Sequence, residues 1–209
     1  GNVLSKPQFS HFVGFVQGLS ACEIPSLSRM SEIHCKSRSS MDHFLTESPW
    51  EISSLKTIYH NQIKSLVENN SSLLIDDSIS HRPYARKVEK ANFHYDHTTG
   101  KDSLGYSIVT SVISSNEEII PYDLIPYYCK EDCDGKSFKT KNTFAVEIID
   151  STKNNPNITE VIFDTWYSNE QVIGACKKAK KHYITQIKSN RNVTINQHKN
   201  AVRTFVKGI

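Results

Sequence analysis

The 209-residue sequence contains no long apolar run and no recognisable leader. No stretch approaches the roughly 18 consecutive apolar residues of a membrane-spanning helix, so we expect no membrane partner. The first residues, 1–4, lack a basic segment followed by an apolar one, so no signal peptide is predicted. Because an initiator Met is also missing, we expect a fragment of a longer protein. The chain is 37% hydrophobic and 22% charged, which excludes the disordered and collagen-like classes.

Cysteine is sparse and odd in number, at positions 22, 35, 129, 133 and 176. This pattern is typical of a protein in a reducing compartment rather than of a disulfide-rich secreted one, so we expect a cytoplasmic location. Cys129 and Cys133 form the one close pair, and His94 and His97 are histidines that would complete a zinc site with them. No second cysteine pair supports such a site, and ordinary free thiols are the preferred interpretation.

Charge is distributed unevenly, although the net charge is only +3. Residues 1–70 are neutral overall, residues 71–150 carry −4 and residues 151–209 carry +7. An acidic middle segment beside a basic end suits a site that holds cations next to a polyanion. Chance clustering of charges is the alternative.

The first 70 residues have helical patterning. In the segment 48–51, Ser48 is a good N-cap, Pro49 suits the first helical position and Glu51 completes a capping box. Apolar residues then recur at helical spacing up to Leu66, and shorter helices are predicted before residue 48. A polar break at 69–72 ends this part, so we predict a small helical N-terminal domain over 1–70, which either binds DNA or serves as a packing domain.

Beyond residue 70 the apolar pattern changes to that of an α/β domain. We predict the order β-β-β-α-β-α-β, with strands at 73–75, 106–113, 119–129, 160–163 and 183–187 and helices opening at Asn142 and at the capping box 168–171. The first three strands would form an antiparallel meander, and the helical crossovers would add parallel strands to give a mixed sheet. The segment between the first two strands is expected to be a polar, basic loop.

Two aspartates follow the two most buried-looking strands. Asp77 comes after the first strand and Asp164 after the fourth. If these strands are parallel neighbours, both carboxylates lie at the same edge of the sheet, where α/β proteins bind ligands. Paired carboxylates bind hard divalent cations, so we predict a site for Mg²⁺ or Mn²⁺. Asp76 is the weaker candidate because strand alternation turns it the other way. The alternative is that each Asp simply caps a turn.

Three segments together resemble the bacterial and archaeal insertion-sequence DDE transposases. The run 74–78, followed by a basic loop and 105–109, is similar to their first-aspartate region. The run 161–168 is similar to their second-aspartate region, in which Asp-x-x-Tyr precedes a helix. The segment 38–50 resembles the helical region ahead of their catalytic core. The three segments occur in the family's order and cover most of the chain.

The resemblance implies a ribonuclease H-like fold over 71–209 and metal-dependent cleavage and strand transfer of DNA, with two metal ions in the complete site. It assigns the first two catalytic, metal-binding acids to Asp77 and Asp164. The family's third acid, a Glu on a later helix, has no match, because the one acid after Asp164 is Glu170, six residues on. We therefore expect the core to be C-terminally incomplete and this fragment to be inactive.

Basic and aromatic residues near the two aspartates are candidate DNA contacts. Lys and Arg would neutralise phosphates, and Trp or Tyr would stack on a base. The candidates are Arg82, Arg86, Lys87, Lys90, Trp166, Tyr167, Lys177, Lys178 and Lys181. The expected partner is double-stranded DNA at the nucleoid, both transposon ends and target, with a homodimer on DNA as a further expectation. Two alternatives stay open: an inactive DNA-binding remnant, and another ribonuclease H-like nuclease acting on RNA or branched DNA.

Overall fold

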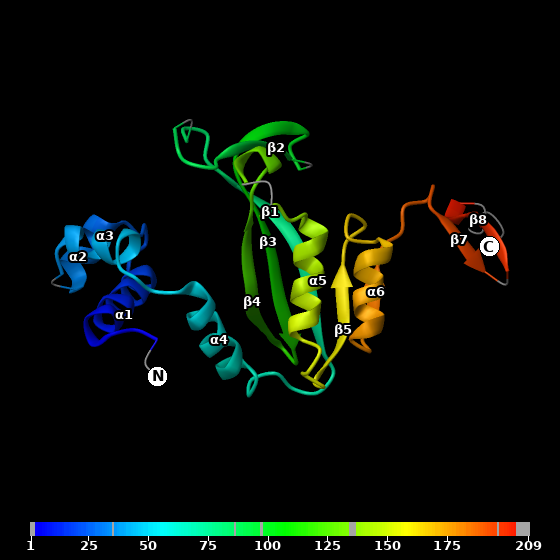
Figure 1. Cartoon of the computed structure of the whole chain (residues 1–209), viewed down its shortest axis with the longest axis horizontal. Helices are drawn as coiled ribbons and strands as arrows, with labels where there is room; N and C mark the ends of the chain where they lie inside the picture. The colour runs from blue at the N-terminus through cyan, green and yellow to red at the C-terminus, as the bar shows by residue number, and fades with distance from the viewer. Residues whose placement is uncertain are drawn as a thin grey trace. The chain divides into compact units, whose positions relative to one another are not determined.

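The computed structural model describes residues 3–34, 36–85, 87–96, 98–133, 137–195 and 197–203 (Figure 1). By its internal contacts the chain divides into two compact units, Gly1–Gln62 and Ile63–Ile209. The division falls at the end of a helix, somewhat before the polar break from which the sequence predicts the boundary. Among the described residues, no helix is both long enough and apolar enough to cross a bilayer.

The first unit is helical, as the sequence predicts. It contains α1 (Lys6–Ala21), α2 (Leu27–His34), α3 (Arg38–Thr46) and most of α4 (Ile52–Ile63). A capping box opens α1: the Ser5 side chain accepts from the Gln8 N–H, and the Gln8 side chain accepts from the Ser5 N–H. The core of this unit is formed by Met30, Met41 and Phe44, all of which are buried.

The predicted capping box at 48–51 is wrong, because α4 begins only at Ile52. Trp50 explains the difference. Its ring stacks on Phe44 at 5.7 Å between centroids, and its Nε1–H donates to the Phe44 carbonyl at 2.9 Å. The segment before α4 is therefore held against α3. The Glu51 carboxylate accepts instead from the Ser53 and Ser54 hydroxyls in the first turn of α4.

The second unit is built on one six-stranded mixed sheet. Its strands are β1 (Ser71–His81), β2 (Asn92–Asp96), β3 (Lys101–Ser115), β4 (Glu118–Tyr127), β5 (Ile158–Phe163) and β6 (His182–Thr185). The order is β2-β3-β1-β5-β6, and β4 pairs with the later part of β3, on the edge whose first residues pair with β2. β2, β3 and β4 belong to the antiparallel part, whereas β5 and β6 run parallel to β1. The predicted meander and parallel crossovers are thus confirmed, with β2 as an added strand.

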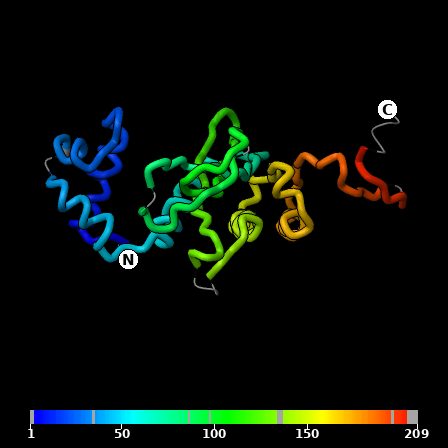
Figure 2. The backbone as a smooth tube through the Cα atoms, turned by 90° about the horizontal axis from the view of Figure 1, so that it is seen from above, coloured from blue at the N-terminus to red at the C-terminus, as the bar shows by residue number. Residues whose placement is uncertain are grey.

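Two helices, α5 (Lys141–Ser151) and α6 (Glu170–Lys178), form the crossovers and pack side by side on one face of the sheet (Figures 1 and 2). The core between the two layers includes Leu73, Ile75, Val109, Ile113, Val161, Phe163, Ala145, Ile148, Ile149, Val172 and Cys176. On β1 the buried residues alternate with partly exposed ones. Asp77 is next in the buried series after Leu73 and Ile75, so its carboxylate faces the helix layer at the edge of the core.

The caps of these helices differ slightly from the sequence prediction. α5 begins one residue early, with the Thr140 hydroxyl accepting from the Thr143 N–H. α6 is capped by Asn169, whose side chain accepts from the Val172 N–H, rather than by Ser168. Smaller elements are a 3₁₀ turn, η1 (Lys130–Asp132), and a separate two-stranded hairpin of β7 (Asn192–Ile195) and β8 (His198–Ala201).

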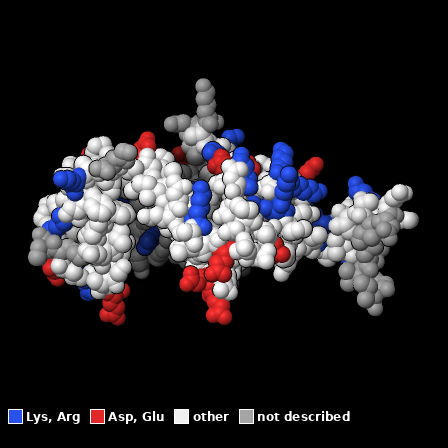
Figure 3. Space-filling view, turned by 90° about the horizontal axis from the view of Figure 1, so that it is seen from below, with Lys and Arg blue, Asp and Glu red and all other residues white. Residues whose placement is uncertain are grey.

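Positive charge gathers at one end of the sheet. α6 runs antiparallel to β5, because it connects that strand to its parallel neighbour β6. Its last turn therefore carries Lys177 and Lys178 to the end at which β5 begins. Figure 3, which views the molecule from below, shows a group of Lys and Arg side chains over α6.

Candidate active site

The site lies at the point where β1 and β5 part. Their parallel pairing runs from Leu73 opposite Val161 to Ile75 opposite Phe163. β5 then ends, and Asp164 follows directly. The prediction that β1 also ends near Asp77 is wrong, because β1 continues to His81 against its antiparallel partner β3. Asp77 nevertheless lies at the carboxyl edge of the parallel pair, which is the geometry that the sequence predicts.

Both aspartates line one cavity of about 790 Å³. Asp76, Lys141, Trp166 and Lys188 are on its wall as well. His81 from β1 and His94 and Asp96 from β2 line the same cavity. The cavity thus combines carboxylates, two lysines and an exposed indole.

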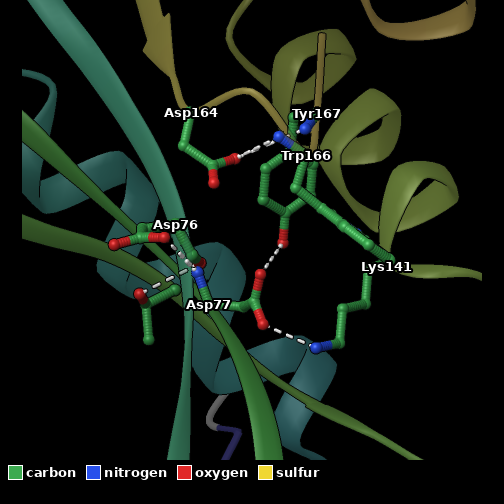
Figure 4. Close-up of polar contacts among 7 residues, drawn as sticks. Asp76, Asp77, Lys141, Asp164, Trp166 and Tyr167 are labelled. Carbon is green, nitrogen blue, oxygen red and sulfur yellow. Dashed lines mark hydrogen bonds and ion pairs between the residues drawn. The ribbon is translucent and has the colours of Figure 1, made fainter. Parts of the chain in front are cut away.

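Asp77 is held by two side chains from distant segments (Figure 4). Its Oδ1 accepts from the Tyr167 hydroxyl at 3.1 Å, and its Oδ2 accepts from the Lys141 ammonium at 2.5 Å. Asp76 lies on the other side of β1, where its Oδ1 accepts from the Asp77 N–H at 2.8 Å. The alternation that makes Asp76 the weaker candidate is present in the structure.

Asp164 is exposed and ordered by its own loop. Its Oδ1 accepts from the N–H groups of Trp166 at 2.9 Å and Tyr167 at 3.3 Å. This is the turn-capping role that the sequence offers as the alternative for a single Asp. The same bonds fix the carboxylate at the cavity wall, so capping a turn and lining the site are compatible here.

The negative charges of Asp77 and Asp164 raise the pKa values of neighbouring groups in the site. The pKa of Asp76 is raised chiefly by burial, and the charges of Asp164 and Asp77 add to that rise, against the lowering effect of the Asp77 N–H. The pKa of Tyr167 is raised far above its usual range by burial first and by the charge of Asp77 next. Like charges gathered in this way favour a bound cation.

The donors present fit a hard divalent metal. Carboxylate oxygen is the ligand type that Mg²⁺ and Mn²⁺ prefer, and each carboxylate oxygen has more than one lone pair, so bonds already made do not exclude coordination. Within the described ranges, no group of three or more His, Cys, Asp and Glu residues is arranged to hold a metal. Asp77 and Asp164 would therefore share a metal with water or phosphate oxygens.

The described part of the chain contains no cluster of His, Cys, Asp and Glu residues that would form the alternative zinc site. Cys129 and Cys133 are free thiols. His94 is on the wall of the acidic cavity. His97 lies outside the described residues.

Two of the proposed DNA contacts are wrong. Tyr167 is fully buried, so its ring cannot stack on a base, and its hydroxyl serves Asp77 instead. Lys181 is only 6% exposed, and its ammonium donates to the carbonyls of Ile158 at 2.6 Å and Asn155 at 3.2 Å. Both residues have polar tips that are used inside the protein, which a sequence pattern does not reveal.

The remaining candidates that the structure describes are exposed, and one of them lies at the cavity. Trp166 is 55% exposed on its wall. Arg82 and Lys90 line a different cavity of about 470 Å³, and Lys87 is exposed in the same loop. Lys177 and Lys178 are at the far end of α6, roughly 12 Å along the helix axis from its start near Asp164. Arg86 lies outside the described residues.

The contacts of Lys141 and Tyr167 with the Asp77 carboxylate were not predicted from the sequence. Lys141 is 64 residues from Asp77 in sequence, and only the packing of α5 brings them together. One local signal was available: a lysine in the first turn of a helix opposes the helix dipole, and the first turn of α5 has no acidic residue to offset it. Such a lysine is expected to have an anion elsewhere in the fold.

Comparison with known proteins identifies the family of the chain. The family model described as DDE superfamily endonuclease matches residues 19–203. A curated relative, the probable transposase for insertion sequence element IS701 of Microchaete diplosiphon, is 24% identical over 187 residues. The match covers 88% of this chain and 49% of the relative, so the chain spans about half of that relative's length. The mixed sheet with its two crossover helices is a ribonuclease H-like fold, and the chain belongs to the DDE superfamily of endonucleases.

Proposed function

We propose that Asp77 and Asp164 are the first two metal-binding acids of a transposase that cleaves DNA at transposon ends and transfers the strand to target DNA. The observation that carries the proposal is the placement of both carboxylates on one cavity at the carboxyl edge of the adjacent parallel strands β1 and β5. The family match and the IS701 relative support the same activity.

Each protein group has a role in this proposal. Bound Mg²⁺ or Mn²⁺, two ions in the complete site, would activate the attacking oxygen and stabilise the leaving one. Asp77 and Asp164 hold these cations, Tyr167 orients the Asp77 carboxylate, and the loop N–H groups orient Asp164. Lys188 and Trp166, on the same cavity wall, would contact the phosphate and an unpaired base of the DNA.

The proposed partner is double-stranded DNA, with the nucleoid as the place of action and a homodimer as the assembly on DNA. A duplex is wide enough to extend past the cavity, so the exposed residues Lys87, Lys177 and Lys178 remain candidate phosphate contacts outside it.

Metal binding tests the site directly. Mn²⁺ affinity is measured by the loss of the free-ion electron paramagnetic resonance signal, for the wild-type chain and for Asp77→Asn and Asp164→Asn. Each variant should bind Mn²⁺ at least about tenfold more weakly, because it loses one of two charged ligands. Unchanged affinity in both variants would reject the site.

Cleavage separates the alternatives. With Mg²⁺ or Mn²⁺ and supercoiled plasmid, the 209-residue chain should give weak or no nicking, because among the described residues no third acid is arranged with Asp77 and Asp164 to hold a metal. Vigorous nicking that Asp164→Asn abolishes would reveal a third ligand. DNA binding without Mn²⁺ binding would favour the inactive remnant, and preferential cutting of RNA or branched DNA would favour the other nuclease class.

A further inference from the structure

A lysine lies where a cation would bind Asp77. The Lys141 Nζ is 2.5 Å from Asp77 Oδ2, and the two side chains are only 21% and 22% exposed. Lys141 is also on the wall of the cavity that Asp164 lines. The Lys141 ammonium therefore contacts the same carboxylate that coordinates a metal ion in the proposed function.

Two further features hold the ammonium at this place. It lies 5.4 Å from the centroid of the Tyr127 ring in a cation–π arrangement. Its backbone is the first residue of α5, whose start is fixed by the Thr140 cap. A lysine in this turn is disfavoured by the helix dipole, so the contact with Asp77 offsets a local cost.

A second lysine, which lies just before the N-cap of α5, shows what an ordinary surface pair looks like. Lys139 pairs with Glu147 at 2.6 Å, and those side chains are 47% and 45% exposed. Among the described residues, the Lys139 ammonium pairs with Glu147 and with neither Asp77 nor Asp164, although it lies only two residues from Lys141. It carries the same charge in nearly the same place, and therefore serves as the matched control.

We propose that Lys141 is a positioning residue that acts as the built-in counter-ion of Asp77 and is exchanged for the metal ion when it binds. In the metal-free protein it neutralises Asp77 and keeps the carboxylate oriented beside Tyr167. On metal binding the ammonium leaves Oδ2 and stays in the cavity as a positive charge for the DNA phosphate. The inference rests on the proposed function in one respect, namely that Asp77 is a metal ligand.

The exchange predicts that removing the lysine charge strengthens metal binding. Mn²⁺ dissociation constants are measured at low ionic strength for the wild-type chain and for Lys141→Met, Lys141→Gln, Lys141→Arg and Lys139→Met. The two neutral Lys141 variants should bind Mn²⁺ about threefold to tenfold more tightly, because the metal no longer displaces an ion pair. Lys141→Arg, which keeps the charge, should stay near the wild-type value, and Lys139→Met should change it by less than about twofold.

A second measurement uses the free protein. Without metal, Lys141→Met should unfold at a lower temperature than the wild-type chain, and saturating Mn²⁺ should raise its midpoint by more than it raises that of the wild type. A residue that merely supports the fold would lower the midpoint but would not tighten Mn²⁺ binding. Lys141→Gln provides the same test if the Met variant does not fold.

The outcomes distinguish this inference from the proposed function. If Asp164→Asn weakens Mn²⁺ binding while both neutral Lys141 variants bind it equally or more weakly than the wild type, the counter-ion role is wrong and the metal site stands. If neither Asp77→Asn nor Asp164→Asn weakens binding, both proposals are wrong. Equal tightening by Lys139→Met would also overturn the counter-ion role, because a general charge effect would then account for it.

Discussion

The hydroxyl of Tyr167 links the two aspartate segments through a single hydrogen bond to Asp77, while the Tyr167 N–H contacts Asp164. Tyr167→Phe removes the hydroxyl and leaves the buried ring in place. We expect a loss of about 0.5–1.5 kcal/mol in the free energy of unfolding, because Asp77 can recover only part of the bond from water. Mn²⁺ affinity should fall severalfold, since Asp77 loses a donor that orients it. Urea unfolding and Mn²⁺ titration check both effects. An unchanged free energy of unfolding together with an unchanged Mn²⁺ affinity would contradict the proposal that Tyr167 orients Asp77.

Lys181 has a structural role that can be separated from DNA binding. Lys181→Met leaves the buried carbonyl of Ile158 and the partly buried carbonyl of Asn155 without this donor, so the free energy of unfolding should fall by about 1–3 kcal/mol. Affinity for duplex DNA should not change, because the ammonium is not accessible. Urea unfolding and a DNA titration of the folded variant measure the two effects. A large loss of DNA affinity at unchanged stability would contradict this assignment.

The same lysine gives a pH dependence of known sign. Burial lowers the pKa of Lys181, so between that pKa and about 10.4 the unfolded chain binds more protons than the folded one. The stability of the wild type relative to Lys181→Met should therefore rise as pH increases through this range. Burial raises the pKa of the neighbouring Cys176 thiol to about 11, so the thiol stays protonated during most of the titration. Urea unfolding at several pH values between 7 and 10 measures the difference; a falling difference would contradict the sign.

At the scale of elements, the extension of β1 depends on a glycine in β3. A Cβ added at Gly105 would lie 2.2 Å from the Ser80 carbonyl oxygen, and β1 pairs with β3 at this point. The backbone of β1 or β3 must shift to make room for this Cβ, so Gly105→Ala should lower the free energy of unfolding by about 1–3 kcal/mol. Gly174→Ala in α6 is the matched control, since nothing lies within 4 Å, and it should stabilise by about 0.5–1 kcal/mol. Urea unfolding of the two variants measures both changes in the free energy of unfolding. Equal changes would mean that β1 and β3 have room to separate at Gly105.

The elements that the sequence predicts best are those with a clear apolar period. β5 and the core of β3 alternate or run as buried residues, and both are present close to the predicted bounds. β2 could not be predicted, because the residues of Asn92–Asp96 are mostly polar and their ladder exists only through the long partner β3. For the same reason β1 continues past Asp77: its pairing with β3 stabilises a segment whose own pattern is that of a turn.

At the scale of the whole molecule, strand adjacency was the predictable part of the site. Two acids after two buried strands predict convergence as soon as the strands are parallel neighbours, and β1 and β5 are. The side-chain partners of Asp77 could not be identified from the sequence, because Lys141 and Tyr167 are 64 and 90 residues away from it. The position of Lys141 in the first turn of α5 indicates an anionic partner but not which one. The net charge of a segment did not predict at which end of the sheet its basic side chains lie. The lysines of the basic segment 151–209 were expected beside the two aspartates, yet Lys177 and Lys178 are at the other end of α6.

That separation gives a prediction about how DNA lies on the protein. Lys188 is exposed on the wall of the acidic cavity, whereas Lys153 is exposed beyond the end of α5, at the opposite edge of the sheet. If DNA enters the cavity, Lys188→Gln should weaken duplex binding and reduce the slope of log K against log salt by about 0.9, the value for one phosphate contact. Lys153→Gln, which removes the same charge elsewhere, should leave the slope unchanged. Titrations at several salt concentrations, in Ca²⁺ to prevent cleavage, measure both slopes. A slope that falls only with Lys153→Gln would place the DNA on the end of the sheet away from Asp77 and Asp164, and the carboxylates would then have no substrate within reach.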